Sequence, residues 1–349
     1  MILAQEQVGL GHRVKVLPLK GKVELFHEFA HAGVEVDLTL LNKGFMTQVY
    51  LLRKFLSRNR EVICHAHLPR AELVLALTFR VKVLRIGTKH NAERMLPNGN
   101  KILSRFLAKF IESRYETIIC ISKVVFDFLL KSGEMKNTSK YLVVHYGVIV
   151  AKERKSINRR PLKESLKIIS IARLSPQKNL LHVVETARKL RIIDFDFKWY
   201  IFGEGYLRSD LEERIENLQL GDFVKLPGKV DAIDAELAYS DVLVITSNYE
   251  GFGLVLLEAM NMGKPIVAPK IPIFREILGE DYTGFYSEDS DGLANKLVSL
   301  TKKSELDELG DITWNLRLLF DAKKMVQNTI GVYLTSVERV RVRRGLKRG

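Results

Sequence analysis

Short apolar runs alternate along this chain with longer segments in which apolar residues recur every three or four positions. Runs of strand length that are rich in Val, Ile, Leu and Phe occupy residues 62–68, 166–173, 197–202, 242–246 and 265–269. A run that is apolar on both faces is typical of a strand buried in a parallel sheet, and the segments between the runs have the period of amphipathic helices. The pattern predicts an α/β fold built from doubly wound parallel sheets.

The first part of the chain predicts strands over residues 13–19, 34–41 and 62–68, separated by helices over residues 23–33 and 45–58. The chain has 349 residues, of which 46% are hydrophobic and 28% are charged. This length and composition suit two globular α/β domains of ordinary size.

Residues 242–269 form the stretch around which the rest of the chain is organised. A β-branched run leads into a loop that contains Gly251 and Gly253, and an apolar helical segment, Gly263 and a second strand follow. Glycines let the backbone of such a loop approach a ligand, and the helix behind it directs free N–H groups toward that ligand. A phosphate group suits this position.

Two carboxylates, Glu250 and Glu258, flank the loop with seven residues between them. A carboxylate can accept paired hydrogen bonds from a vicinal diol, so the loop suits a ligand that has both phosphates and sugar hydroxyls. A sugar nucleotide has both groups. Taken singly, either glutamate is as readily a solvated surface acid, and only the combination favours a nucleotide-sugar site.

This spacing, with Gly251-Phe252-Gly253 between the two glutamates, resembles the signature of the family 4 glycosyltransferases. The resemblance runs over nearly the whole chain and is strongest over residues 166–300. It implies the GT-B fold, in which two Rossmann-like domains face a cleft, and a retaining glycosyltransferase of the hexosyltransferase type.

The resemblance also implies a role for each matching residue. Glu258 is expected to bind the donor's ribose and Glu250 the donor sugar. The full set expected to hold the donor is Arg173, Lys178, Gly203, Gly205, Val230, Gly251, Phe252, Gly253, Leu254 and Glu258, and the set expected to act in catalysis is Glu250, His90, Arg173 and Lys178.

Two cations, Arg173 and Lys178, lie on a predicted strand-to-helix turn. Positive charge at that place would stabilise a diphosphate leaving group, because negative charge develops on it as the glycosidic bond breaks. A pair of surface salt bridges is the other interpretation of these two residues. The Gly203-Glu-Gly205 turn is a weak signal by itself and gains weight only from its place in the family pattern.

The expected reaction moves a sugar from a nucleotide-diphosphate donor, expected to be UDP-linked, to a glycan or lipid-linked acceptor in polysaccharide or lipopolysaccharide synthesis. The donor is a substrate, and neither a cofactor nor a metal is expected. The resemblance implies front-side attack by the acceptor hydroxyl, so leaving-group stabilisation is expected rather than a hydrolase-like carboxylate pair. Two alternatives are a truncated, catalytically impaired donor-binding protein and a sugar-nucleotide epimerase on a similar fold.

The family opens with a strand and a Gly-Gly loop that have no counterpart in this sequence. In a doubly wound sheet that strand lies in the middle, so we expect the strands at residues 13–19 and 62–68 to flank a gap with unpaired backbone groups. Three interpretations are open: a start assigned too far downstream, a truncated product, and a rearranged N-terminal domain.

The predicted strand over residues 62–68 carries two histidines. His65 and His67 alternate on this strand, but no Cys, Asp or further His supplies a convincing third ligand, so no metal site is predicted. His65 is expected to be a hydrogen-bonded loop residue. His90 resembles the family's histidine beside the donor sugar, and a hydrogen-bonded loop residue is the other interpretation. Cys64 and Cys120 are expected to be buried free thiols in a reducing cytosol.

The domain boundaries follow from composition and from the resemblance. We expect an N-terminal acceptor-side domain over residues 1–151, a charged linker over 152–164, a nucleotide-sugar-binding domain over 165–315, a terminal helix over 316–336 that returns to the first domain, and a basic tail over 337–349.

The net charge of +14 is unevenly distributed. Residues 1–165 hold 29 Lys and Arg against 14 Asp and Glu, whereas residues 166–338 hold 20 against 27. A positive first half predicts attraction to an anionic membrane surface, and the chain has no pattern that predicts a nucleic-acid partner. We therefore expect a cytoplasmic protein that is peripheral on the inner face of the plasma membrane.

The segment over residues 101–114 predicts an amphipathic helix whose apolar stripe has basic flanks. We expect the stripe to pack on the core of its own domain, and the alternative is an interfacial helix on anionic lipid. The stripe consists of Ile102, Leu103, Phe106, Leu107, Phe110 and Ile111, and the flanks of Lys101, Arg105, Lys109 and Arg114.

Overall fold

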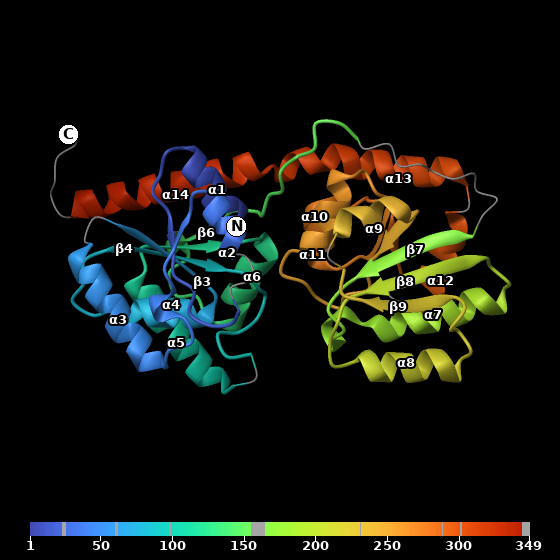
Figure 1. The fold of residues 1–349 in the computed structure, drawn as a ribbon, viewed down its shortest axis with the longest axis horizontal. Helices are drawn as coiled ribbons and strands as arrows, with labels where there is room; N and C mark the ends of the chain where they lie inside the picture. Colours follow the sequence, from blue (N-terminus) through green and yellow to red (C-terminus); the bar gives the residue numbers. More distant parts are fainter. Residues whose placement is uncertain are drawn as a thin grey trace. The chain divides into compact units, whose positions relative to one another are not determined.

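A computed structural model gives the structure of the chain and describes residues 1–22, 26–59, 62–97, 99–154, 165–230, 232–287, 289–300 and 302–343. The chain forms two compact units. Unit 1 comprises Met1–Ile149 and Ala322–Gly349, and unit 2 comprises Val150–Asp321. Both are built from parallel strands and helices, so the predicted α/β fold is confirmed (Figure 1).

Unit 2 contains a six-stranded parallel sheet in the order β12-β11-β10-β7-β8-β9. Chain order runs outward from β7 to β9 on one side and then returns to the other side of β7 with β10. The strands are β7 (Leu166–Ile171), β8 (Phe197–Phe202), β9 (Val224–Gly228), β10 (Val242–Val244), β11 (Ile266–Pro269) and β12 (Phe285–Tyr286).

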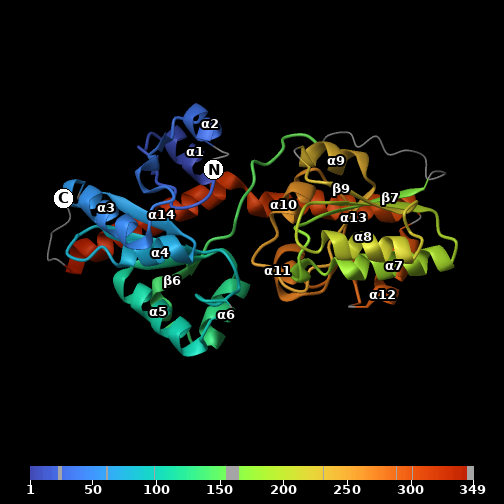
Figure 2. The ribbon, with the colours of Figure 1, turned by 60° about the horizontal axis from the view of Figure 1, so that its bottom comes forward.

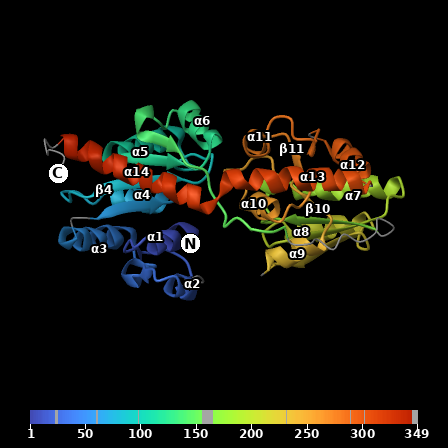
Figure 3. The same ribbon diagram turned by 90° about the horizontal axis from the view of Figure 1, so that it is seen from above.

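Helices cover both faces of this sheet. In unit 2, α7 and α8 lie side by side on one face (Figure 2), and α10 and α13 lie side by side on the other (Figure 3). The helices are α7 (Leu180–Ile192), α8 (Arg208–Asn217), α9 (Ile233–Tyr239), α10 (Leu254–Asn261), α11 (Pro272–Leu278), α12 (Ser290–Ser299) and α13 (Lys303–Leu316), with 3-10 turns η3 (Pro176–Lys178) and η4 (Arg317–Phe320).

The centre of unit 2 is apolar on both faces of the sheet, as the unbroken apolar runs predict. Ile168 and Ile169, which point to opposite faces of the sheet, are 0% and 1% exposed, and Trp199 has no exposed surface. The indole Nε1–H of Trp199 donates to Ser170 Oγ at 3.1 Å, so the one polar atom of this ring is satisfied within the core.

Unit 1 contains a four-stranded parallel sheet in the order β3-β4-β5-β6 and a separate parallel pair, β1-β2. The strands are β1 (Lys15–Val16), β2 (Glu35–Val36), β3 (Ile63–His67), β4 (Leu84–Lys89), β5 (Thr117–Cys120) and β6 (Tyr141–Val143). The helices are α1 (Ile2–Gly9), α2 (Phe26–His31), α3 (Phe45–Arg58), α4 (Pro69–Ala76), α5 (Lys101–Arg114), α6 (Lys123–Ser132) and α14 (Ala322–Arg343), with 3-10 turns η1 (Leu38–Leu40) and η2 (Thr138–Lys140).

The strands β1 and β2 are shorter than the sequence pattern predicts. Among the described strands, β1 pairs with β2 alone, and β3 pairs with β4 alone. The two strands that were expected to flank the missing central strand are thus not joined to each other. Residues 38–40 form η1 in place of the end of the predicted strand, because the side chain of Asp37 accepts the backbone N–H of Thr39.

The helix α14 joins residues from the end of the chain to the sheet of unit 1. Val332 packs in a buried cluster with Ile86, Ile119 and Val144. The hydroxyls of Ser336 and Thr117 lie 2.7 Å apart in a buried hydrogen bond. These contacts explain why the residues after Asp321 belong to unit 1.

Two boundaries differ from the sequence-based expectation. The terminal helix begins at Ala322 and continues to Arg343, so the first seven residues of the expected basic tail are helical. Arg343 Nη1 lies 2.9 Å from Glu116 Oε2, which holds this end against β5. The helix α13 was missed, and residues 155–164 of the expected linker and 344–349 of the tail lie outside the described residues.

Cys64 and Cys120 are free thiols, as expected, but only Cys120 is fully buried and Cys64 is partly exposed. Burial raises the pKa of Cys64 to about 11 and that of Cys120 to about 12. None of the described helices is both long and apolar enough to cross a membrane.

Candidate functional site in unit 2

Two loops of unit 2 leave the carboxyl ends of adjacent parallel strands. Residues 172–179 follow β7, and residues 245–253 follow β10, which pairs with β7. The chain order reverses between these two strands. In open α/β sheets, ligands bind outside the carboxyl ends of the strands at such a switch point.

Hydrogen bonds join these two loops into one surface. Thr246 Oγ1 donates to Lys178 O at 2.7 Å, and Asn248 N donates to Gln177 O at 2.9 Å. Gln177 Nε2 also donates to Tyr249 O at 3.0 Å. Residues 72 positions apart in the chain therefore keep a fixed geometry at the sheet edge.

Glu250 lies at the centre of this surface and is only 9% exposed. Its Oε1 atom forms an ion pair with Lys178 Nζ and accepts a hydrogen bond from Ser247 Oγ at 2.8 Å. Gln177 Nε2 lies 3.5 Å from the other carboxylate oxygen. The buried negative charge is thus compensated by one cation and two neutral donors.

Gly253 begins the helix α10. Its φ of +88° lies in the left-handed region, where a side chain would be strained, and no side chain caps this helix end. The first-turn N–H groups of a helix and its dipole favour an anion at this place. Phe252 is 2% exposed and its ring meets that of Phe320 edge to face at 5.8 Å, so only the backbone of Phe252 is suited to contact a donor.

Glu258 lies in α10, five residues after Gly253. Its Oε2 atom is buried and has no hydrogen-bond partner. Burial and, to a smaller degree, the nearby Asp234 raise the pKa of this carboxyl above its usual value. A buried acceptor without a donor is costly, and a hydroxyl donor from a ligand would remove that cost.

Gly203 and Gly205 hold the loop after β8 against the backbone of the β7 loop. A Cβ on Gly203 would lie 1.9 Å from Ala172 O, and one on Gly205 would lie 2.2 Å from Leu174 O. Leu174 N donates to Glu204 O at 3.0 Å in the same contact. These two glycines are therefore required by backbone packing that positions the segment of Arg173, which is itself exposed. Val230 follows β9 and is half-buried.

The histidines of unit 1 form a connected group at the carboxyl ends of β3 and β4. His65 bonds Tyr333 Oη at 2.7 Å and Thr88 Oγ1 at 2.6 Å, so it is hydrogen-bonded within the unit as expected, but it lies in β3 and not in a loop. His67 Nδ1 lies 3.0 Å from His90 Nε2, and His90 Nδ1 bonds the hydroxyl of Tyr146. Both ring nitrogens of His90 are thus engaged by neighbours.

Burial lowers the pKa of each of these three histidines. The pKa falls well below its usual value for His65 and to about 4 for His67 and His90. Part of His67 is exposed, but its ring lies 4.2 Å from that of His65 and 5.2 Å from that of His90, so the ring itself is shielded. Within the described residues, no group of three or more His, Cys, Asp and Glu is placed to hold a metal ion.

Comparisons with known proteins agree with this geometry. Residues 152–309 match the family model described as glycosyl transferases group 1. N-acetyl-alpha-D-glucosaminyl L-malate synthase of Bacillus anthracis is 33% identical over 148 residues, which cover 42% of this chain and 39% of that protein. The UDP-Gal:alpha-D-GlcNAc-diphosphoundecaprenol alpha-1,3-galactosyltransferase of Escherichia coli is 26% identical over 75% of this chain and 72% of its own length.

Among solved structures, Anabaena HepE in complex with UDP-glucose matches with a TM-score of 0.78 at 18% identity, over 96% of this chain and 95% of that one. The chain shares the fold of these solved structures, and its residues 152–309 are similar to the group 1 glycosyl transferases. The matched residues lie within unit 2, and the expected GT-B fold is confirmed.

The structure joins some of the residues expected at the site and leaves others apart. It brings Lys178 onto Glu250, places Arg173 in the same loop, and gives Gly253 and Glu258 the helix positions that were expected. His90 belongs to unit 1. Sequence analysis missed Ser247 and Gln177; the only available signal was their position, three residues before Glu250 and directly before Lys178.

The backbone contact at Gly203 gives a first prediction. Replacing Gly203 by Ala puts a methyl group on Ala172 O and forces an unfavourable φ of +136°, so we expect a loss of about 3 kcal/mol in the free energy of unfolding. Thermal unfolding of the variant would shift down by roughly 6–12 °C. The control is Gly221→Ala, where a Cβ meets nothing within 4 Å, and an equal shift in both variants would contradict this account.

The histidine group gives a second prediction, on pH dependence. Because the folded-state pKa of His90 is lowered from 6.5 to about 4, the neutral ring stabilises the fold fully above pH 6.5 and progressively less as the pH falls toward 4. His90→Gln should therefore lose less stability than the wild-type protein between pH 6.5 and 4 in thermal unfolding. The exposed His12 provides the control His12→Gln, and identical pH profiles for all three proteins would refute the prediction.

Proposed function

We propose that this glycosyltransferase transfers a sugar from a UDP-linked donor to a glycan or lipid-linked acceptor, with retention of anomeric configuration. The observation that carries the proposal is the unpaired, buried Oε2 of Glu258 in the helix that starts at Gly253. A nucleotide with a diphosphate at the helix N-terminus and a ribose diol on Glu258 would satisfy both features at once.

The proposed roles of the charged residues follow from their positions. Arg173 is exposed beside the switch point and is suited to the donor diphosphate. The ammonium group of Lys178 compensates the charge of Glu250, and it would also stabilise negative charge on the leaving phosphate. Glu250 would accept hydrogen bonds from the donor sugar through the oxygen that is not paired with Lys178.

This arrangement supports leaving-group stabilisation over covalent catalysis by Glu250. A carboxylate whose Oε1 already accepts from Lys178 and Ser247 has that oxygen occupied and is a weak nucleophile. The proposal needs no cofactor, because the nucleotide sugar is itself a substrate. The role of His90 beside the donor sugar, which the family resemblance implies, stays a prediction.

The names of related proteins support the choice of donor and acceptor. The Escherichia coli relative uses UDP-Gal and an acceptor linked to diphosphoundecaprenol, and the Anabaena structure contains UDP-glucose. We infer a related role in cell-surface polysaccharide or glycolipid synthesis. A cytoplasmic protein that works at an anionic membrane surface, without a nucleic-acid partner, fits the basic charge of the first half of the chain.

The test is a transfer assay with UDP-glucose, UDP-galactose and UDP-N-acetylglucosamine and an N-acetylglucosamine acceptor on an undecaprenyl diphosphate. We expect an α-linked product from one donor, identified from its anomeric proton coupling in NMR. Glu250→Gln should lower kcat by roughly 10²-fold, because it removes the charge that faces the donor sugar. Glu213→Gln, an exposed glutamate on α8, is the matched control and should leave kcat unchanged.

Three outcomes would contradict the proposal in different ways. A β-linked product would exclude retention. UDP binding without transfer to any acceptor would favour a donor-binding protein. A new nucleotide sugar formed in the absence of acceptor would favour an isomerising enzyme.

A further inference from the structure

The helix α5 of unit 1 exposes large apolar side chains. Ile102 is 76% exposed, Phe106 is 67% exposed and Leu103 is 49% exposed. The expectation that the whole stripe packs on the core is wrong for this half of the helix. Ile111, near the C-terminal end, is buried as expected.

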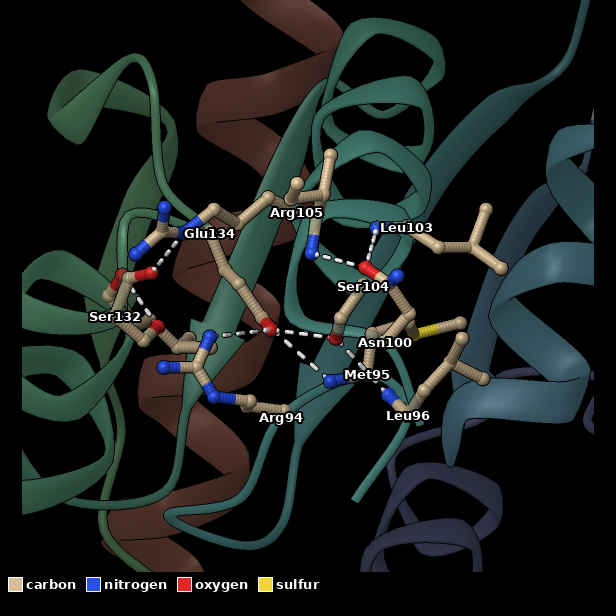
Figure 4. Close-up of polar contacts among 11 residues, drawn as sticks. Arg94, Met95, Leu96, Asn100, Leu103, Ser104, Arg105, Ser132 and Glu134 are labelled. Carbon is tan, nitrogen blue, oxygen red and sulfur yellow. Dashed lines mark hydrogen bonds and ion pairs between the residues drawn. The ribbon is translucent and has the colours of Figure 1, made fainter. Parts of the chain in front are cut away.

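A buried polar network fixes α5 in this orientation. Ser104 Oγ donates to Glu134 Oε1 at 2.7 Å, and Met95 N donates to Glu134 Oε2 at 3.0 Å (Figure 4). Ser104 is 0% exposed and Glu134 is 1% exposed. Figure 4 shows the Leu103 side chain extending away from this network. The side of the helix that carries Ser104, Ala108 and Ile111 is thus the one turned inward, and a rotation that would bury Ile102 and Phe106 would break these bonds.

The exposed apolar residues form a continuous ridge. Ile102, Phe106 and the half-buried Phe110 are spaced by four residues and so lie along one side of the helix, over about 12 Å. The ring of Phe110 lies 6.4 Å from that of Phe79, which is 44% exposed and extends the ridge. A ridge of this size on a surface is typical of an interaction site.

The charge beside the ridge has one sign. Lys101, Arg105 and Lys109 are exposed on the neighbouring side of the same helix. The one acidic residue of α5, Glu112, is 4% exposed and accepts the backbone N–H groups of residues 136 and 137 at 2.7 Å each. The exposed part of α5 therefore combines apolar side chains with positive charge alone.

We propose that α5 docks unit 1 on an anionic lipid bilayer, with Ile102, Leu103 and Phe106 inserted at the boundary between headgroups and acyl chains. Lys101 and Lys109 then contact lipid phosphates. An exposed apolar ridge flanked by basic residues is the pattern of an interfacial helix. A second copy of this chain fits less well, because a two-fold contact through α5 would place the basic rows against each other.

The proposal deepens the proposed function and rests on it only for the acceptor, which the same membrane would present. Unit 1 as a whole carries 31 Lys and Arg against 13 Asp and Glu, whereas unit 2 carries 24 against 28. The attraction to an anionic surface is therefore concentrated in the unit that contains α5.

The test is co-flotation of the full-length protein with phosphatidylcholine vesicles that contain or lack phosphatidylglycerol. We expect binding only to the anionic vesicles. The double variant Ile102→Ser, Phe106→Ser should bind at least tenfold more weakly, because two apolar side chains no longer leave water. The variant Lys101→Gln, Lys109→Gln should bind about fivefold more weakly for each charge and should lose part of the salt dependence.

The matched control is Ile192→Ser, Ile193→Ser on α7 of unit 2, where the two side chains are 68% and 59% exposed. This variant should bind vesicles like the wild-type protein. Equal vesicle binding by the α5 variants, or equal wild-type binding to neutral vesicles, would overturn the proposal. A dimer in solution that the Ile102→Ser, Phe106→Ser variant abolishes would assign the ridge to a second copy and would also overturn it.

UDP binding separates this proposal from the proposed function. The α5 variants should retain wild-type affinity for UDP, because their substitutions lie in unit 1 and the nucleotide site lies in unit 2. A wild-type protein that binds anionic vesicles but not UDP would contradict the proposed function and support the docking surface. A wild-type protein that binds UDP but not anionic vesicles would support the proposed function and contradict α5 as a membrane contact.

Discussion

The half-buried ion pair between Lys178 and Glu250 is the interaction on which the candidate site depends. A carboxylate that is 9% exposed costs several kcal/mol unless it is paired, and Lys178, Ser247 and Gln177 together supply that pairing. Because these residues come from two loops after adjacent strands, the pair also fixes the loops relative to each other. The relative position of the two loops at the switch point is thus fixed by the residues that compensate the negative charge of Glu250.

A second constraint fixes the loop after β8 against the loop after β7, which carries Lys178. Gly203 and Gly205 let the loop after β8 touch the backbone of residues 172–174, which leaves no room for a side chain. The site is therefore formed before any ligand arrives, with two features still unsatisfied: the helix end at Gly253 and the free oxygen of Glu258. Both are suited to the phosphate and hydroxyl groups of one ligand, which is why we propose a nucleotide sugar as that ligand.

The sequence pattern predicted most of the elements that position this site, because strands buried on both faces and glycine loops leave clear local signals. It missed the partnership of Lys178 with Glu250, since a contact between residues 72 positions apart depends on the strand order and not on local spacing. It also misjudged α5: the stripe from Ile102 to Phe110 has the period of a core-facing helix, but Ser104 and the distant Glu134 decide which side turns inward. The missed α13 begins without a side-chain cap, so its start had no local marker.

Calorimetric titration of UDP into the wild-type protein and into Glu258→Ala tests the central claim most directly. The account predicts that UDP binds the wild-type protein at one site, and that Glu258→Ala weakens binding by roughly tenfold or more, because two hydrogen bonds to a charged acceptor are lost. The variant should remain as stable as the wild-type protein or become more stable, since it removes a buried, unpaired oxygen. Equal UDP affinity in the two proteins, or no binding to a folded wild-type protein, would contradict the assignment of the switch point as a nucleotide-sugar site.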